Sequence, residues 1–241
     1  MSEVTPFQKG VTSKGKLIYL KNKTNYTADF YDEGIFHVYN RTNNKELLFR
    51  SDENRLYFLR QYHKYLHPFL DTFCWNLLPN HFHFLVRIKT GEAIKKHLKI
   101  LETRTLKPIE RKYLEDSAGT ELLLELEWKR FFNSYAMAFN KQHQRRGNLF
   151  QRPFKRVEVI KETHFTQAVI YIHANAQHHQ LCSDFARHQW SSWHTMLSDK
   201  PTHLKREEVL EWFGGRQQLI DIHKNMSGFY FNGENSIEDD D

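Results

Sequence analysis

The hairpin expected at residues 70–88 constrains the fold more than any other feature of this sequence. The run LDTFCWNLL predicts one strand, and after a turn at Pro79 the run HFHFLVRI predicts its antiparallel neighbour. Because side chains alternate along a strand, His81 and His83 share one face, whereas Phe82 and the apolar residues in phase with it share the other. The hairpin therefore presents an apolar face to a core and two imidazoles to the opposite side.

Hydrophobic periodicity around this hairpin predicts the order strand, helix, two strands, helix, strand, helix, with short helices after it. This order indicates an α+β fold: a ferredoxin-like split β-α-β antiparallel sheet with helices on one face, plus a C-terminal helical extension. The expected elements are strand 34–40, a short return at 47–49, helix 51–66, strands 70–78 and 81–88, helix 91–101, a charged loop at 102–120, helix 121–141, strand 153–160 and helix 163–179.

We expect four segments along the chain. They are a partly ordered N-terminal segment at 1–33, a main domain at 34–180, the helical extension at 181–231 and an acidic tail at 232–241. The last eight residues carry five acids, and without them 35 basic residues stand against 24 acidic ones, a formal charge of +11. Such a basic body fits a protein that binds a polyanion, although a solvated basic surface explains the same count.

Two further observations bear on the cellular compartment in which the protein is expected. No stretch approaches the roughly 18 consecutive apolar residues of a membrane-spanning helix, and the N-terminus lacks the apolar core of a signal peptide. The two cysteines form no paired-thiol motif, so a reducing compartment is the simpler expectation. We therefore expect a cytoplasmic protein with no membrane partner.

The imidazole face of the hairpin is a candidate for metal binding. His81 and His83 are separated by one residue, close enough to hold one divalent cation, but a complete site needs at least one more protein ligand. An isolated His-x-His also describes two half-buried surface histidines, and the chain has 15 histidines. The pair predicts a metal site only if another element supplies the third ligand.

The helix expected at 163–179 offers that ligand. At 100° per residue, Tyr171 lies at the centre of a polar stripe, and Asn175 follows one turn later on the same side. The rest of the stripe is His164, Gln167 and His178. The helix follows a strand directly, so it can cross the sheet over His81 and His83 and bring them an amide oxygen and a phenol. The alternative is a boundary tyrosine whose hydroxyl reaches water.

Four pieces of sequence together resemble a known family. In chain order they are His81-Phe82-His83, RRGNLFQRPFKRVEV, YIHAN and QWSSW. Over residues 34 to 197 the set resembles the single-tyrosine HUH transposases, and within them the REP-associated tyrosine transposases. The resemblance implies that 34–180 is a catalytic domain acting on single-stranded or hairpin DNA. It implies Tyr171 as the nucleophile and, as metal ligands, His81, His83 and Asn175. Family members usually have proline after the asparagine, where this chain has Ala176.

The implied reaction is attack by the tyrosine oxygen on a DNA phosphorus, which displaces a 3′ hydroxyl and leaves a 5′-phosphotyrosine link for rejoining. A divalent ion, Mg²⁺ or Mn²⁺, would polarise the phosphate. The proton acceptor stays open between His178, Gln167 acting through water, and bulk solvent. Basic residues around the connection from helix to strand are candidates for contacting DNA phosphates: Lys141, Arg145, Arg146, Arg152, Lys155 and Arg156.

Three functions therefore compete. The first is a DNA strand transferase, the second a non-catalytic, domesticated protein that binds DNA or RNA hairpins, and the third a hydrolase that uses the histidine pair to activate water. The sequence also leaves the oligomeric state open, and a homodimer in which the tyrosine acts across the interface is one possible arrangement.

Overall fold

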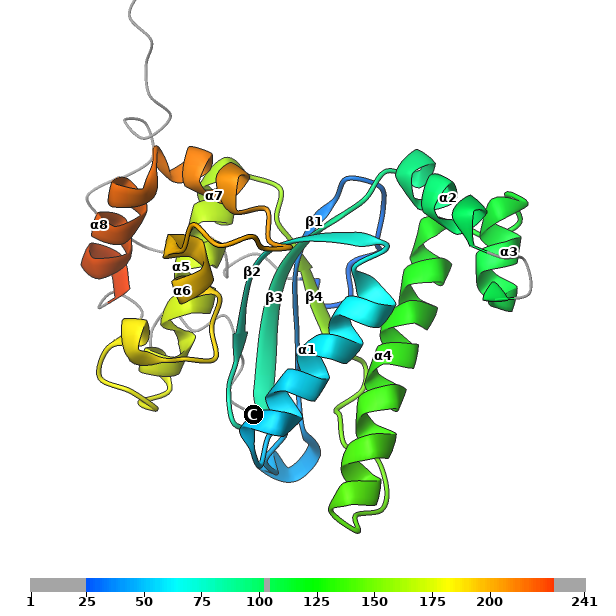
Figure 1. The fold of residues 1–241 in the computed structure, drawn as a ribbon, viewed down its shortest axis with the longest axis horizontal. Coiled ribbons are helices and arrows are strands. Elements are labelled where there is room, and N and C mark those ends of the chain that lie inside the picture. Colours follow the sequence, from blue (N-terminus) through cyan, green and yellow to red (C-terminus); the bar gives the residue numbers. More distant parts are fainter. Residues whose placement is uncertain (1–24, 102–104, 228–241) are drawn as a thin grey trace, which may run out of the picture.

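The structure, a computed structural model, describes residues 25–101 and 105–227 (Figure 1). Its centre is a four-stranded antiparallel sheet with the order β2-β3-β1-β4. The strands are β1 (Ile35–Arg41), β2 (Leu70–Leu77), β3 (His81–Ile88) and β4 (Lys155–Glu158). Since β3 lies between β1 and β2, the helix that joins them spans a split β-α-β unit. The expected α+β class with an antiparallel sheet is confirmed.

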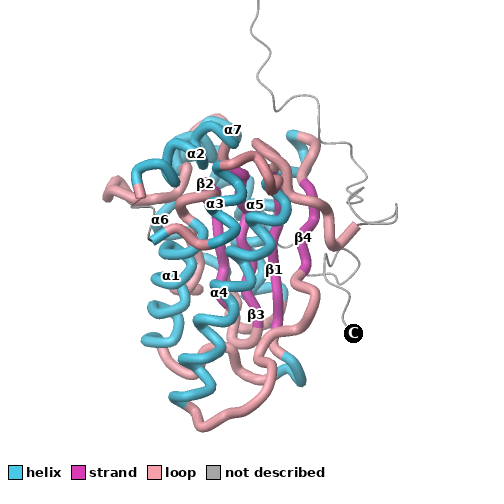
Figure 2. The backbone as a smooth tube through the Cα atoms, turned by 90° about the vertical axis from the view of Figure 1, so that its right-hand side faces the viewer, coloured by secondary structure: helices cyan, strands magenta, loops and turns pink. Residues whose placement is uncertain are grey.

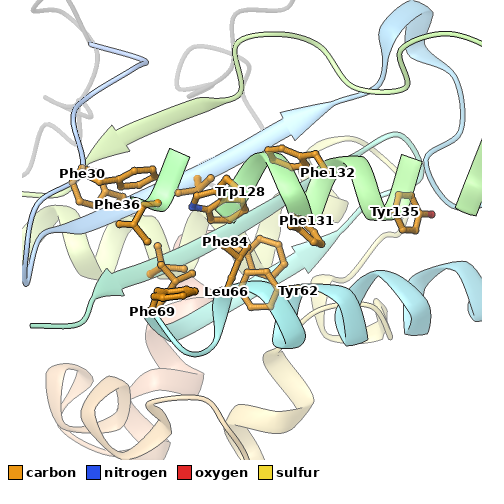
Figure 3. Packing of buried hydrophobic residues seen from close by; sticks show 14 of the residues in the cluster. Phe30, Phe36, Tyr62, Leu66, Phe69, Phe84, Trp128, Phe131, Phe132 and Tyr135 are labelled. Carbon is orange, nitrogen blue, oxygen red and sulfur yellow. The ribbon is translucent and has the colours of Figure 1, made fainter. Parts of the chain in front are cut away.

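Two long helices, α1 (Asp52–Leu66) and α4 (Thr120–Gln142), cover one face of the sheet and lie in front of the strands in Figure 2. The apolar side of β3 meets them there, as Figure 3 shows for Phe84 and the aromatic residues around it. Tyr62 of α1 stacks on Phe84 with 4.0 Å between ring centroids. The predicted division of β3 into an apolar face and a histidine face is therefore confirmed.

Local sequence explains where α1 begins and which side it buries. The Ser51 hydroxyl accepts a hydrogen bond from the Asn54 backbone N–H, as expected for a helix N-cap, and Asp52 adds negative charge to the first turn. The buried residues recur every four positions and form one stripe: Asn54, Phe58, Tyr62 and Leu66. The helix ends before Pro68, which cannot continue it.

A second layer covers the opposite face of the sheet. There α5 (Glu162–His178) crosses β2 and β3, and α6 (Trp193–Leu197), α7 (Arg206–Phe213) and α8 (Arg216–Ser227) surround it together with the short turn η5 (Phe185–Arg187) (Figure 1). The expectation that the helices share one face is wrong on this point. Every residue of α5 from 168 to 176 is buried, so this helix needs cover on both sides, which the sheet and the C-terminal helices provide.

Two connections also differ from expectation. The charged stretch at 102–120 contains a helix, α3 (Pro108–Leu114), with proline at its first position, where a missing N–H costs no hydrogen bond. It packs beside α2 (Gly91–Ile100) and the start of α4. The return expected at 47–49 is not a strand; instead a short 3-10 turn, η3 (Asn43–Lys45), follows β1.

Residues just before the first strand belong to the main core. Ala28 and Phe30 are buried in the cluster beneath α4, and Thr27 bridges to Arg156 of β4. Residues 1–24 and the acidic tail expected at 232–241 lie outside the described residues. Among the described residues, no helix combines the length and apolar character needed to cross a membrane.

Candidate active site

The two histidines of β3 lie at the start of the strand, on the face that α5 covers. His83 is fully buried and His81 is 7% exposed. Their rings stand edge to face, with centroids 5.3 Å apart. Alternation along the strand places both rings on one side, as the sequence predicts.

Helix α5 brings its polar stripe to these histidines. The Asn175 Oδ1 lies 3.3 Å from the His81 Nε2, and the Tyr171 ring meets the His83 ring edge-on with centroids 5.9 Å apart. Tyr171 and Asn175 are buried as well. The structure therefore assembles two imidazoles, one amide and one phenol from β3 and α5.

A buried amide on the neighbouring strand fixes α5 against the sheet. Asn76 of β2 pairs directly with His83, so its side chain points to the same face. Its Nδ2 donates a 2.7 Å hydrogen bond to the backbone carbonyl of Ile172 in α5. Asn76 is fully buried, so loss of this bond would leave a desolvated polar group. This hydrogen bond therefore fixes the position of α5, and with it the distance of Tyr171 and Asn175 from the two histidines.

The contacts of His81 indicate the state of the ring nitrogen that faces Asn175. The His81 Nδ1 lies 2.6 Å from the Asn80 Oδ1, which only accepts, so in a neutral His81 ring the proton is on Nδ1 and the lone pair on Nε2. That lone pair and the Asn175 Oδ1, another acceptor, face each other at 3.3 Å. Two acceptors at this spacing suit a shared cation, because ligands about 2.1 Å from an octahedral ion and at right angles lie about 3 Å apart.

A third histidine, which the sequence did not single out, supports His83. The Nε2 of His37 in β1 lies 2.9 Å from the His83 Nδ1. When the His83 Nδ1 donates this bond, its Nε2 keeps a lone pair for a metal, the arrangement by which outer histidines orient metal ligands. Alternation along β1 puts His37 in phase with Tyr39, but only the structure shows the register in which Tyr39 pairs with His83.

The donor set fits a divalent cation. Two imidazole nitrogens and one amide oxygen would leave coordination positions open on such an ion. His81, His83 and Asn175 would hold the ion, and the hydrogen bonds from Asn80 and His37 would orient the two imidazoles.

The two candidates for proton transfer lie on the same helix as Tyr171. His178 is half-buried, and its ring centroid is 6.4 Å from that of Tyr171. Gln167 is half-buried one turn before Tyr171. A further imidazole lies close by, because His179 meets His81 edge to face at 4.9 Å between centroids.

The six basic candidates fall into two groups. Arg145 holds the Glu46 carboxylate with two hydrogen bonds of 2.6 and 2.8 Å, which lowers the pKa of Glu46. Arg156 is only 4% exposed and bonds to Glu121 at 2.6 Å and Glu125 at 2.9 Å. These two arginines are engaged within the fold. The residues whose charge faces solvent are Lys141, Arg146 and Arg152, with Lys155 half-buried.

The QWSSW motif anchors the far side of α5. Ser192 is buried; its hydroxyl accepts from the Trp75 backbone N–H at 2.9 Å and lies 2.8 Å from the His173 Nε2. The His173 Nδ1 lies 3.0 Å from the His223 Nε2, and the His223 Nδ1 lies 2.8 Å from the carbonyl of Leu219.

These four contacts have a single consistent direction. Leu219 accepts from His223, so the His223 Nε2 accepts from His173, and the His173 Nε2 accepts from the Ser192 hydroxyl. Both imidazoles are therefore neutral, and burial lowers the pKa of His223 to about 4 and that of His173 well below its ordinary value. This series of hydrogen bonds connects β2, α5, the start of α6 and α8 beneath the candidate site.

Comparison with known proteins bears on the fold. The chain is similar to a solved structure described as a REP-associated tyrosine transposase bound to a REP hairpin. The TM-score is 0.50 and the sequence identity 14%, over 74% of this chain and 88% of that one. No family model matches the chain, and neither does any curated protein. At this identity the likeness concerns the fold alone, and the chemistry must be argued from the residues.

Proposed function

We propose that this protein cuts and rejoins single-stranded DNA, with Tyr171 as the nucleophile. The observation that carries the proposal is the meeting of Tyr171 and Asn175 of α5 with His81 and His83 of β3. These four side chains come from parts of the chain about 90 residues apart, and together they form the set that the resemblance implies. A packing role alone would not require two imidazoles and an amide with facing lone pairs.

The reaction is a transesterification. The Tyr171 hydroxyl releases its proton to solvent or a neighbouring base, and its oxygen forms a bond to a DNA phosphorus. The bond from that phosphorus to the 3′ oxygen breaks, and the 3′ oxygen takes up a proton and leaves as a hydroxyl. A divalent ion bound by the two histidines and Asn175 supplies charge stabilisation at the phosphate. The product is a 5′-phosphotyrosine, which keeps the energy of the phosphodiester for rejoining.

A DNA hairpin is the substrate we propose. The similar solved structure is described as bound to a REP hairpin. In this chain the exposed charges of Lys141, Arg146 and Arg152 lie at or beyond the end of α4, on the connection to β4, and would contact phosphates. Tyr171 is 1% exposed, so the residues that cover it must move before a DNA strand reaches its hydroxyl.

Incubation of the full chain with an end-labelled DNA hairpin and Mn²⁺, followed by a denaturing gel, tests the proposal. We expect a covalent protein–DNA band that disappears in Tyr171→Phe and persists in Tyr57→Phe, a matched change on α1 away from the site. Cleavage that leaves a free phosphate end and no covalent band would identify a hydrolase instead. Binding without any cleavage would identify the non-catalytic hairpin-binding protein.

A further inference from the structure

A second group of histidines lies outside the candidate active site. His63 and His67 are one turn apart near the end of α1, so they project from the same side of the helix, and their rings stack at 4.3 Å between centroids. The His203 ring lies 4.6 Å from that of His63 and 4.9 Å from that of His67. One ligand nitrogen from each of the three lies within 4.8 Å of the others.

Backbone contacts hold His203 in this position. The adjacent Leu204 bridges to Thr72 of β2, and the Lys205 N–H donates a 2.9 Å hydrogen bond to the Thr72 carbonyl. The Lys205 ammonium lies 3.3 Å from Asp71. The segment between α6 and α7 is therefore attached to the edge strand β2, and the attachment carries His203 to the end of α1.

This group is separate from the candidate active site. α1 lies on the face of the sheet opposite to α5, which carries Tyr171 and Asn175. Thr72, beside His203, is five residues along β2 from Leu77, which pairs with the strand start near His81. At about 3.3 Å per strand residue, the two sites are about 17 Å apart along the sheet alone.

We propose that His63, His67 and His203 form a site for a transition-metal cation such as Zn²⁺. Three imidazole nitrogens about 2.0–2.1 Å from the ion, with water in the fourth position, make a tetrahedral zinc site. His63 and His203 are exposed, so an ion has access and the rings are able to turn inward to close the spacing. The triad offers three imidazole nitrogens and no oxygen ligand, which favours a transition metal over Mg²⁺ or Ca²⁺, whose usual ligands are oxygens.

Charged side chains of both signs lie near the triad. Lys89 donates a 2.7 Å hydrogen bond to the His67 carbonyl, and Asp71 opposes its charge nearby. The consequence of binding is structural: the ion would clamp the C-terminal segment at His203 to α1.

Zinc binding by the full chain, measured by competition with a chromophoric chelator, tests the proposal. The background is His81→Ala with His83→Ala, which removes the imidazoles of the other site. We expect this background protein to bind one equivalent of Zn²⁺ at the triad. The bound zinc should be lost when His63→Ala and His67→Ala are added. Outer-shell changes cost metal sites about 10–100-fold in affinity, so removal of a ligand by His203→Ala should cost more than about 100-fold.

His194→Ala serves as the matched control, because His194 is exposed on α6 outside the triad. It should retain the bound equivalent. A second measurement uses Co²⁺, whose visible absorption is intense in a four-coordinate site, and the band should vanish in the His63→Ala, His67→Ala protein. Retention of zinc by that protein, or no zinc bound at micromolar concentration in the background, would overturn the proposal. The outcome does not depend on DNA cleavage.

Discussion

The His81 Nε2 and the Asn175 Oδ1 lie 3.3 Å apart, and in a neutral His81 ring that donates from Nδ1 to Asn80 both of these atoms are acceptors. Two lone pairs directed at each other in a buried setting repel unless a cation or a proton lies between them. This relationship explains why an asparagine one turn after Tyr171 matters: it converts a histidine pair into a three-donor site.

Asn175→Ala should abolish metal-dependent formation of the covalent DNA adduct while the chain remains folded. Asn175→Asp keeps an oxygen at the same position and should retain part of the activity, with a lower Mn²⁺ concentration at half-maximal rate because the ligand is charged. Adduct yield across a Mn²⁺ titration is the measurement, with thermal unfolding as the folding control. Equal loss in both variants would argue against ligation by Asn175.

His37→Phe should weaken Mn²⁺ binding about 10–100-fold, because partners that orient a ligating histidine contribute about that much. His37→Gln keeps an acceptor for the His83 Nδ1–H and should lose less. Calorimetric titration with Mn²⁺ in the absence of DNA measures the effect independently of activity. If the phenylalanine variant binds Mn²⁺ as tightly as the unaltered protein, His37 has only a packing role.

Arg156→Met should destabilise the fold rather than weaken DNA binding. The change removes the partner of Glu121 and Glu125, and we expect a loss of about 2–3 kcal/mol, below the usual cost of breaking a buried ion pair because both glutamates are partly exposed. Urea unfolding gives the free energy of unfolding. A variant of unchanged stability but reduced hairpin affinity would contradict the structural role.

Removal of the exposed arginines, in contrast to that of Arg156, should weaken DNA binding and leave the stability of the fold unchanged. Arg146→Gln with Arg152→Gln should lower hairpin affinity and reduce the slope of log affinity against log salt by about 1 for each phosphate that is no longer neutralised. Stability should not change, because both side chains are exposed. Fluorescence anisotropy at several salt concentrations measures the slope. Lys64→Gln, an exposed change on α1, should leave it unaltered.

The buried pair His173 and His223 predicts a fold that weakens in acid. Burial lowers the pKa of His223 to about 4, whereas an unfolded histidine takes up a proton near pH 6.5. The unfolded chain therefore binds more protons between these values. Stability is complete above about pH 6.5 and falls as the pH drops toward 4, by up to about 1.4 kcal/mol per pH unit for each imidazole.

Urea unfolding between pH 7.5 and 4.5 measures this slope. His223→Gln keeps an acceptor for the His173 N–H but removes one titrating ring, so the slope should be smaller. His194→Ala, at an exposed position, should leave the slope unchanged. An identical slope in the His223→Gln protein would show that other groups cause the acid sensitivity.

Local pattern was sufficient for all four strands of the sheet, for the helices α1, α2, α4 and α5, and for part of the site, but it missed α3. Alternation in HFHFLVRI separates Phe84 from His83, and the helical period places Tyr171 and Asn175 on one side of α5. The N-cap at Ser51 likewise depends only on neighbours within one turn. These features need no knowledge of distant residues.

Contacts between distant segments required the tertiary structure. The pairing of His37 with His83, the His173–His223 chain and the approach of His203 to α1 each join residues 46 or more positions apart. The ion pairs of Arg145 with Glu46 and of Arg156 with Glu121 also join residues distant in sequence, so the sequence alone could not show that these arginines are engaged within the fold. A sequence shows the charge or ring of such a residue, but its partner is chosen by how sheet and helices pack, which decides whether a polar side chain stabilises the fold or remains available for a ligand.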